Sequence, residues 1–209
     1  MHSVLSRNGM KKKIRQNTDI DKYLTYSTIW LESVDSTNNE AKRRLDCLST
    51  LSVIAAYNQT AGRGQRGNMW LSSPGKNLTF SIVLKFDDSQ SQNFNQSDIN
   101  DIISLTIVEL LSNYGINARI KYPNDIYVGD KKISGILIEH SLRGEKMVNS
   151  IIGVGLNVNQ QQFDISLPNP TSMISETGSK EIDLRTLLED LLEIFIKYAR
   201  HLFDSVSNI

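Results

Sequence analysis

The residues best suited to chemistry lie in a glycine-rich loop at 59–67, which reads QTAGRGQRG. Its three glycines free backbone amides for close approach to a ligand, and Arg63 and Arg66 add planar cationic donors. Such a loop can wrap a phosphate or carboxylate group. It lacks the Lys-Ser/Thr ending of a P-loop and the spacing of a dinucleotide-binding loop. The loop therefore predicts a site for a phosphorylated or carboxylated small molecule, with a flexible surface turn as the alternative.

A second cluster combines lysines with a carboxylate on neighbouring predicted strands. It runs from Lys121 to Asp125 and resumes at Lys132. Lysine neutralises phosphate, and an aspartate can hold magnesium or a ribose. Pro123 limits strand pairing, so we expect Asn124 and Asp125 to be displayed at a sheet edge. An ordinary charged hairpin is the alternative.

A third feature is the segment 153–159, a strand that ends in glycines and amides. Asn157 can offer a ligand both a donor and an acceptor. Taken alone, this turn indicates little about function.

The elements that must position these residues follow from hydrophobic periodicity. Alternating segments predict strands over residues 28–34, 52–57, 78–86, 118–122, 126–128, 132–140 and 147–154. Helical spacing predicts a helix near 41–45, capped by Thr37 and Glu40, one across 99–110 that ends at Gly115, and one across 184–195. Residues 87–100 are predicted to be a mobile connection. We expect an α/β or α+β fold with a mixed, largely antiparallel sheet, helices on one face and the ligand on the other.

Composition narrows the class of protein. The chain has 209 residues, of which 39% are hydrophobic, and its 23 basic and 23 acidic residues cancel. Zero net charge argues against nucleic-acid binding, and the single Cys47, expected to be a small buried hydrophobe, excludes an intramolecular disulfide. No apolar run is long enough to span a membrane. We expect a cytoplasmic protein with a frayed extension at 1–27 and one domain at 28–209.

Together, the motifs resemble the catalytic domain of biotin protein ligases, over roughly Trp30 to Phe195. The matching elements are Asp35–Asn38 (DSTN), the loop 59–67, Trp70, Lys121–Asp125, Lys132–Ile136 and Gly153–Asn159. The resemblance implies a class II synthetase-like fold and a two-step reaction. ATP first activates biotin to biotinyl-5′-AMP, and a lysine of a biotin carboxyl carrier protein or carboxylase domain then displaces AMP.

The resemblance also implies roles for individual residues. Biotin-binding residues would be Ser36, Thr37, Asn38, Gln59, Gly62, Arg63, Lys132, Gly135 and Ile136. The adenylate would lie against Arg63, Gln65, Arg66, Gly67, Trp70, Lys121, Asn124, Asp125 and Asn157. Catalytic residues would be Arg63, Lys121, Lys132 and Asp125, with Mg²⁺ arriving with ATP near Asp125 rather than at a fixed metal site. Each of these residues, taken alone, has an alternative role. Ser36 and Thr37 can cap a helix, Trp70 can fill the core, and Asp125 can be a turn residue.

Two positions depart from the family pattern. Gln65 stands where family loops commonly have an arginine associated with holding the adenylate, so we expect the intermediate to escape more readily. Tyr122 replaces a usual tryptophan, an exchange that we expect to be tolerated.

The ends of the chain carry further expectations. Only about thirty residues precede Asp35, too few for the winged-helix DNA-binding domain of some family members. We also expect the SH3-like C-terminal domain of many members to be missing after Ile209. We expect no nucleic-acid or membrane partner, and the resemblance allows a homodimer. The alternatives are a lipoate ligase or octanoyl transferase of the same fold, and a non-catalytic biotin-binding module.

Overall fold

The computed structural model describes residues 25–86 and 96–200. Within these residues, seven strands form one sheet in the order β1-β2-β3-β7-β6-β5-β4. The strands are β1 (Ser27–Leu31), β2 (Ser52–Ala56), β3 (Leu78–Lys85), β4 (Arg119–Lys121), β5 (Asp125–Val128), β6 (Lys131–Arg143) and β7 (Lys146–Leu156). The β1–β2 pair is parallel and the other neighbouring pairs are antiparallel, which confirms the predicted mixed sheet.

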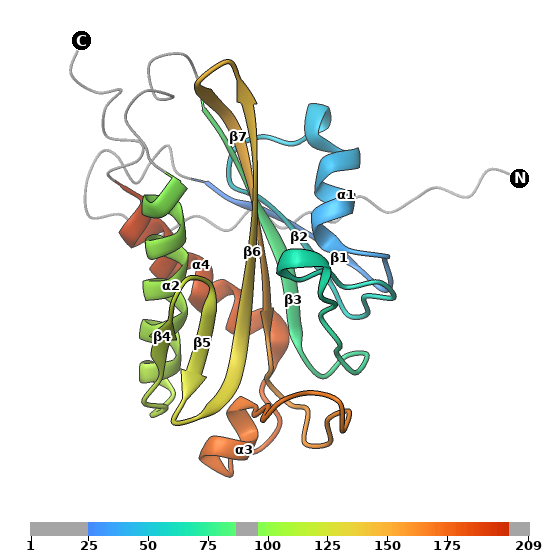
Figure 1. Ribbon diagram of the computed structural model, residues 1–209, viewed down its shortest axis with the longest axis vertical. Coiled ribbons are helices and arrows are strands. Elements are labelled where there is room, and N and C mark those ends of the chain that lie inside the picture. Colours follow the sequence, from blue (N-terminus) through green and yellow to red (C-terminus); the bar gives the residue numbers. More distant parts are fainter. Residues whose placement is uncertain (1–24, 87–95, 201–209) are drawn as a thin grey trace, which may run out of the picture.

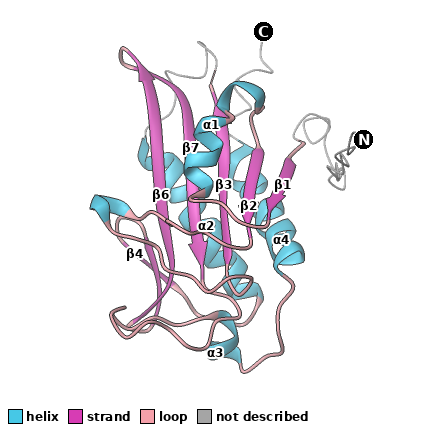
Figure 2. Ribbon diagram, turned by 90° about the vertical axis from the view of Figure 1, so that its right-hand side faces the viewer, coloured by secondary structure: helices cyan, strands magenta, loops and turns pink. Residues whose placement is uncertain are grey.

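Helices cover both faces of the sheet. The long helices α2 (Gln96–Asn113) and α4 (Leu184–Ala199) lie on one side and the shorter α1 (Thr37–Arg43) on the other (Figure 1). Figure 2 shows α1 and a layer of loops in front of the strands, with α2 and α4 behind them. The expectation of helices on one face therefore holds for the two long helices, whereas α1 shares its face with the loops.

The main core forms between the sheet and the two long helices. Leu187, Leu191 and Phe195 of α4 are fully buried there, because the leucine stripe recurs at helical spacing. Asp183 is the N-cap of α4, and its carboxylate accepts a hydrogen bond from the Thr186 amide (2.8 Å). Just after the C-terminal end of α2, Gly115 adopts a φ of +76°. This left-handed conformation confirms the prediction that a glycine ends the helix.

Three glycines leave one part of the α1 face of the sheet without side chains. On β6, Ile136 and Ile138 point into the main core, so Gly135 belongs to the opposite face. Gly135 pairs across the sheet with Gly155, and Leu137 pairs with Gly153. The three glycines form a shallow floor beside α1.

Several local expectations differ from the structure. Helix α1 begins after Ser36 rather than Thr37, and the Ser36 side chain makes no capping hydrogen bond. Residues 96–100 belong to α2 instead of a loop, because Ile99 is buried and continues the helical stripe, while 87–95 lie outside the described residues. Cys47 is exposed, since it lies in a 3₁₀ turn (Leu45–Cys47) beyond α1.

Other short elements complete the fold. A second 3₁₀ turn (Gln65–Gly67) lies inside the glycine-arginine loop, and α3 (Met173–Thr177) was not expected. The predicted frayed extension lies outside the described residues up to residue 24, and Tyr26 is buried against the main core. No helix of the described chain is long and apolar enough to cross a membrane.

Candidate functional site

A cavity of about 260 Å³ opens on the α1 face, above the glycine floor and beneath the loop 59–67. It gathers most of the residues that the sequence singled out. Those lining it are Ser36, Thr37, Asn38, Gln59, Arg63, Gln65, Arg66, Trp70, Asn124, Asp125, Lys132, Gly135 and Ile136. Segments more than a hundred residues apart in the chain, such as those of Ser36 and Gly155, thus meet at one site.

Four of the predicted residues lie elsewhere. Gly62 and Gly67 belong to the loop but do not line this cavity. Lys121 lies on the edge strand β4, where its Nζ is 3.3 Å from the Tyr127 hydroxyl and 4.5 Å from that ring. Asn157 lines a neighbouring cavity instead.

The glycine floor is required by the groups that lie on it. A Cβ atom at Gly155 would lie 2.2 Å from the Trp70 indole, and one at Gly135 would lie 3.0 Å from it. A Cβ at Gly153 would lie 2.2 Å from Asn38 Oδ1. Any larger residue at 153 or 155 would therefore displace Asn38 or Trp70.

The start of α1 forms the polar end of the cavity. The Thr37 backbone amide (2.7 Å) and hydroxyl (3.1 Å) donate to Gln59 Oε1. The buried Ser81 hydroxyl lies 2.6 Å from Asn38 Oδ1 and 2.8 Å from Thr37 Oγ1. Because the Gln59 oxygen is already occupied, its Nε2 amide is the donor left for a ligand.

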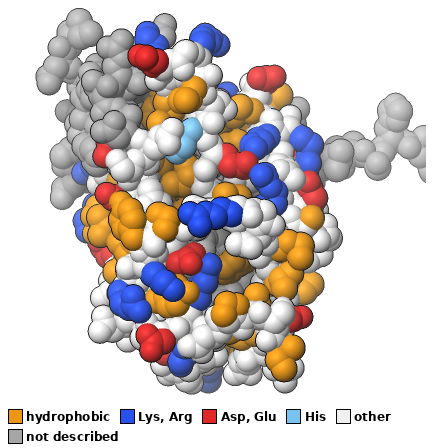
Figure 3. All heavy atoms as spheres, in the orientation of Figure 1, with side chains coloured by type: hydrophobic (Ala, Val, Ile, Leu, Met, Phe, Trp, Pro, Cys, Tyr) orange, Lys and Arg blue, Asp and Glu red, His pale blue; other side chains and the backbone are white. Residues whose placement is uncertain are grey.

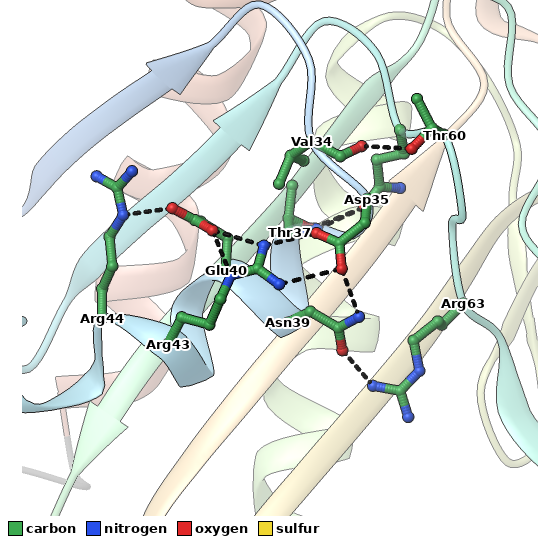
Figure 4. A network of polar contacts seen from close by, with 10 residues as sticks. Val34, Asp35, Thr37, Asn39, Glu40, Arg43, Arg44, Thr60 and Arg63 are labelled. Atoms are coloured by element: carbon green, nitrogen blue, oxygen red, sulfur yellow. Dashed lines mark hydrogen bonds and ion pairs between the residues drawn. The ribbon is translucent and has the colours of Figure 1, made fainter.

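Arg63 is tied to α1 and β6. Its Nη1 donates to Asn39 Oδ1 (2.9 Å), and its guanidinium forms an ion pair with Glu139 (3.1 Å). Figure 4 shows Asn39 between Arg63 and Asp35, with Arg43 on the other side of Asp35. Helix α1 and strand β6 thus each provide an acceptor to the arginine of the loop.

Two carboxylates of this network are held in their ionised form. Hydrogen bonds from Arg43, and then from Asn39, hold the pKa of Asp35 far below its usual range. Burial acts to raise the pKa of Glu139, but hydrogen bonds from Lys42 and Asn38 outweigh it and leave that pKa below its usual value. Both groups therefore accept hydrogen bonds as anions at neutral pH.

Lys132 lies at the opposite end of the floor. Its Nζ forms an ion pair with Asp125 (2.7 Å) and lies 5.8 Å from the centre of the Trp70 ring. The Lys132 backbone is fixed by hydrogen bonds to Asn169 (2.9 Å) and from Thr171 (2.9 Å). The loop before α3 therefore sets the position of this cation.

A second cavity of about 370 Å³ adjoins the first and shares Trp70 and Lys132 with it. Asn157 is 4% exposed, and its Nδ2 donates to the Thr171 carbonyl (2.9 Å), while its Oδ1 is buried with no partner within the described chain. The remaining lining is largely apolar: Met69, Leu71, Leu167, Pro168 and Pro170. The cavity therefore combines apolar walls with one unsatisfied amide oxygen.

On the face of the molecule that Figure 3 shows, Lys and Arg side chains lie among Asp and Glu side chains. The described residues contain no group of three or more His, Cys, Asp or Glu side chains that could hold a metal ion. Within the described residues, cations of the site such as Arg63 and Lys132 form ion pairs with neighbouring carboxylates.

Three residues of the site were missed from the sequence: Asn39, Ser81 and Glu139. A period-2 signal was present for Glu139, since it lies four residues after Gly135 on the same face of β6. Ser81 likewise alternates with the core residues Phe80 and Ile82 of β3. Nothing in the local sequence indicated that Asn39 would contact Arg63.

Comparison with known proteins agrees with this geometry. The profile of the Biotin/lipoate A/B protein ligase family matches residues 30–157. The bifunctional ligase/repressor BirA of Escherichia coli is 29% identical over 163 residues, which are 78% of this chain and 50% of BirA. The biotin–[acetyl-CoA-carboxylase] ligase of Paracoccus denitrificans is 30% identical, over 82% of this chain and 72% of that protein.

A solved structure gives the same result. The biotin protein ligase of Aquifex aeolicus in complex with biotin and ATP superimposes with a TM-score of 0.72 at 31% identity, covering 85% of this chain and 72% of that one. The chain spans about half the length of the BirA relatives that it matches. Because the family profile covers more than half of its residues and the fold agrees, the chain belongs to the biotin/lipoate A/B protein ligase family.

Proposed function

We propose that the chain is the catalytic part of a biotin–protein ligase. It would activate biotin with ATP to biotinyl-5′-AMP and then transfer biotin to a lysine of a biotin carboxyl carrier protein or carboxylase domain. The observation that carries this proposal is the layout of the cavity, in which polar donors at the start of α1 and the cations Arg63 and Lys132 flank a floor without side chains. A cyclic urea against the donors of α1 and a carboxylate between the two cations fit this layout.

In the first step, a carboxylate oxygen of biotin attacks the α-phosphorus of ATP. The bond from that phosphorus to the bridging oxygen breaks, and pyrophosphate leaves. Both reactants are anions, so Arg63 and Lys132 offset their repulsion and stabilise the charge that builds up on the α-phosphoryl oxygens. Arg66 is a further cation of the cavity that can act on the phosphates.

In the second step, the neutral amine of the acceptor lysine attacks the acyl carbon of the adenylate. The bond from this carbon to the phosphate oxygen breaks, AMP leaves and the nitrogen loses a proton. Because the cavity opens to the surface, the acceptor side chain can enter from solvent.

The nucleotide would extend into the second cavity. Trp70 and Asn157 border it, and the unsatisfied Asn157 Oδ1 can accept a hydrogen bond from an amino group. Gln65, Gly67 and Asn124 would lie on the side of the phosphates. Asp125 is a single carboxylate next to that site, which fits the usual way in which Mg²⁺ reaches a nucleotide, with most ligands from phosphates and water. When bound with ATP, Mg²⁺ would neutralise phosphate charge.

We further propose that the protein acts in the cytoplasm and that its macromolecular partner is the carrier protein, with a homodimer as a further assembly.

Exchange of labelled pyrophosphate into ATP tests the proposed function. Exchange that depends on biotin supports the ligase. Exchange that occurs only with lipoate or octanoate would show that the protein activates a different acid. Tight binding of biotin without exchange would show that the protein binds biotin but does not activate it.

A further inference from the structure

Arg63 lies on a loop that is poorly suited to hold a side chain in one orientation. Gly62 and Gly64 flank it, and the Arg63 side chain is 41% exposed. Its guanidinium nevertheless contacts two acceptors from different elements, Asn39 of α1 and Glu139 of β6. The orientation of this arginine therefore depends on residues outside its own loop.

The pattern of donors indicates what these contacts achieve. Nη1 donates to Asn39 Oδ1 (2.9 Å) and to Glu139 Oε2 (3.2 Å), and Nη2 donates to Glu139 Oε1 (3.1 Å). A guanidinium has five N–H donors, so three are used. The two left over, Nε–H and the second Nη2–H, lie on one edge of the group, and no residue of the described chain accepts from either. That edge is a complete fork for a pair of anionic oxygens.

The acceptors are themselves fixed. Asn39 Nδ2 donates to Asp35 Oδ2 (2.9 Å), which turns Asn39 Oδ1 toward Arg63, as Figure 4 shows. Glu139 accepts from Asn38 Nδ2 (2.9 Å) and pairs with Lys42 (2.7 Å), so its carboxylate is held by two partners other than Arg63. A fixed acceptor limits the directions in which the guanidinium can point.

We propose that Glu139 and Asn39 are positioning residues for Arg63: they occupy three of its donors and leave its free edge for the carboxylate of the bound acid. This inference rests on the proposed function. It assigns Glu139 a role through Arg63, not a contact with the substrate.

The first experiment measures the order of the arginine without any ligand. ¹⁵N relaxation of the Arg63 Nε–H resonance, assigned by its loss in Arg63→Lys, is compared in the wild type, Glu139→Ala and Asn39→Ala. Both variants should lower its order parameter. Arg44→Ala is the matched control, because Arg44 is a partly exposed cation at the end of α1 that pairs with Glu40 and contacts neither Glu139 nor Arg63. Equal order in the wild type and Glu139→Ala would overturn the proposal.

The second experiment compares biotin with biotin amide, which lacks the carboxylate, by calorimetry. Glu139→Ala should weaken binding of biotin roughly tenfold, about the contribution of one charged hydrogen bond, and leave binding of the amide unchanged. The effect should vanish in an Arg63→Ala background. An equal loss of affinity for both compounds would indicate a merely structural role of Glu139. Tighter binding of biotin by Glu139→Ala would show that Glu139 competes with the ligand for Arg63. Either result would overturn the proposal.

The two experiments separate this inference from the proposed function. If the wild type shows no biotin-dependent exchange, the proposed function fails, yet the relaxation measurement still decides whether Glu139 orients Arg63. If the wild type shows exchange and Arg63 is equally ordered in all variants, only the inference fails.

Discussion

On the side of α2 and α4 the sheet presents closely packed apolar side chains such as Phe80, Ile82 and Leu84, whereas the α1 side combines a small apolar cluster with glycines, amides and ion pairs. The first face gains stability from burial, which needs only the right period and size. The second face must leave space and hold its donors in fixed directions. The comparison predicts that changes on the first face affect folding and changes on the second affect the reaction.

The largest effect on stability is expected for Phe195→Ala. The Phe195 ring is fully buried in the main core, and its removal leaves a cavity that should cost about 3–5 kcal/mol of unfolding free energy. Urea denaturation measures this loss. Leu105→Ala on α2 is the control, because Leu105 is 43% exposed and should change stability by less than about 0.5 kcal/mol. Similar losses in both variants would contradict the assigned core.

Gly155→Ala should disturb the packing of the α1 face. Its new methyl would lie 2.2 Å from the Trp70 indole, so the ring must move. We expect overpacking to cost about 1–3 kcal/mol of stability and pyrophosphate exchange to fall. In the double variant with Trp70→Ala the stability loss should be relieved, because the clash is gone. An additive loss in the double variant would place the indole elsewhere.

A smaller effect concerns pH. Glu139 has a lowered pKa in the folded protein, so its contribution to stability is present above the usual carboxyl pKa of 4.5 and is lost as pH falls through the folded value. At neutral pH Glu139→Gln should therefore cost about 1 kcal/mol, and this difference from the wild type should shrink toward zero in acid. Thermal unfolding from pH 7 to pH 3 measures it. A difference that grew in acid would contradict the ion-pair network.

The smallest effect is expected at Gln65, which lines the cavity where family loops commonly have an arginine. Gln65→Arg adds a cation near the adenylate and should slow release of biotinyl-AMP roughly fivefold, as one partly exposed ion pair would. Trapping the free adenylate with hydroxylamine measures the release. Gln65→Met is the neutral control. Equal release of biotinyl-AMP from all three proteins would contradict the role assigned to residue 65.

The two faces also differ in how far the sequence predicts them. Local sequence patterns predict the apolar stripe of α4, the end of α2 at Gly115 and the alternation of polar and apolar residues along the strands. The structure confirms these predictions. The loop 59–67 was identified from its composition, and most of its predicted partners line one cavity. The pairing of Arg63 with Glu139 joins residues 76 apart, and no local pattern encodes such a contact. The misplaced cap at Thr37 has the same origin, since its hydroxyl bonds Gln59 instead of the helix.

The central claim is that two cations of the α1 face, Arg63 and Lys132, activate a carboxylic acid with ATP. Biotin-dependent pyrophosphate exchange by the wild type, Arg63→Ala and Lys132→Ala tests it most directly. The wild type should exchange, and each variant should be slower by roughly 100-fold or more, because each cation stabilises charge in the transition state. Near-wild-type exchange in both variants, with their folding intact, would contradict the claim.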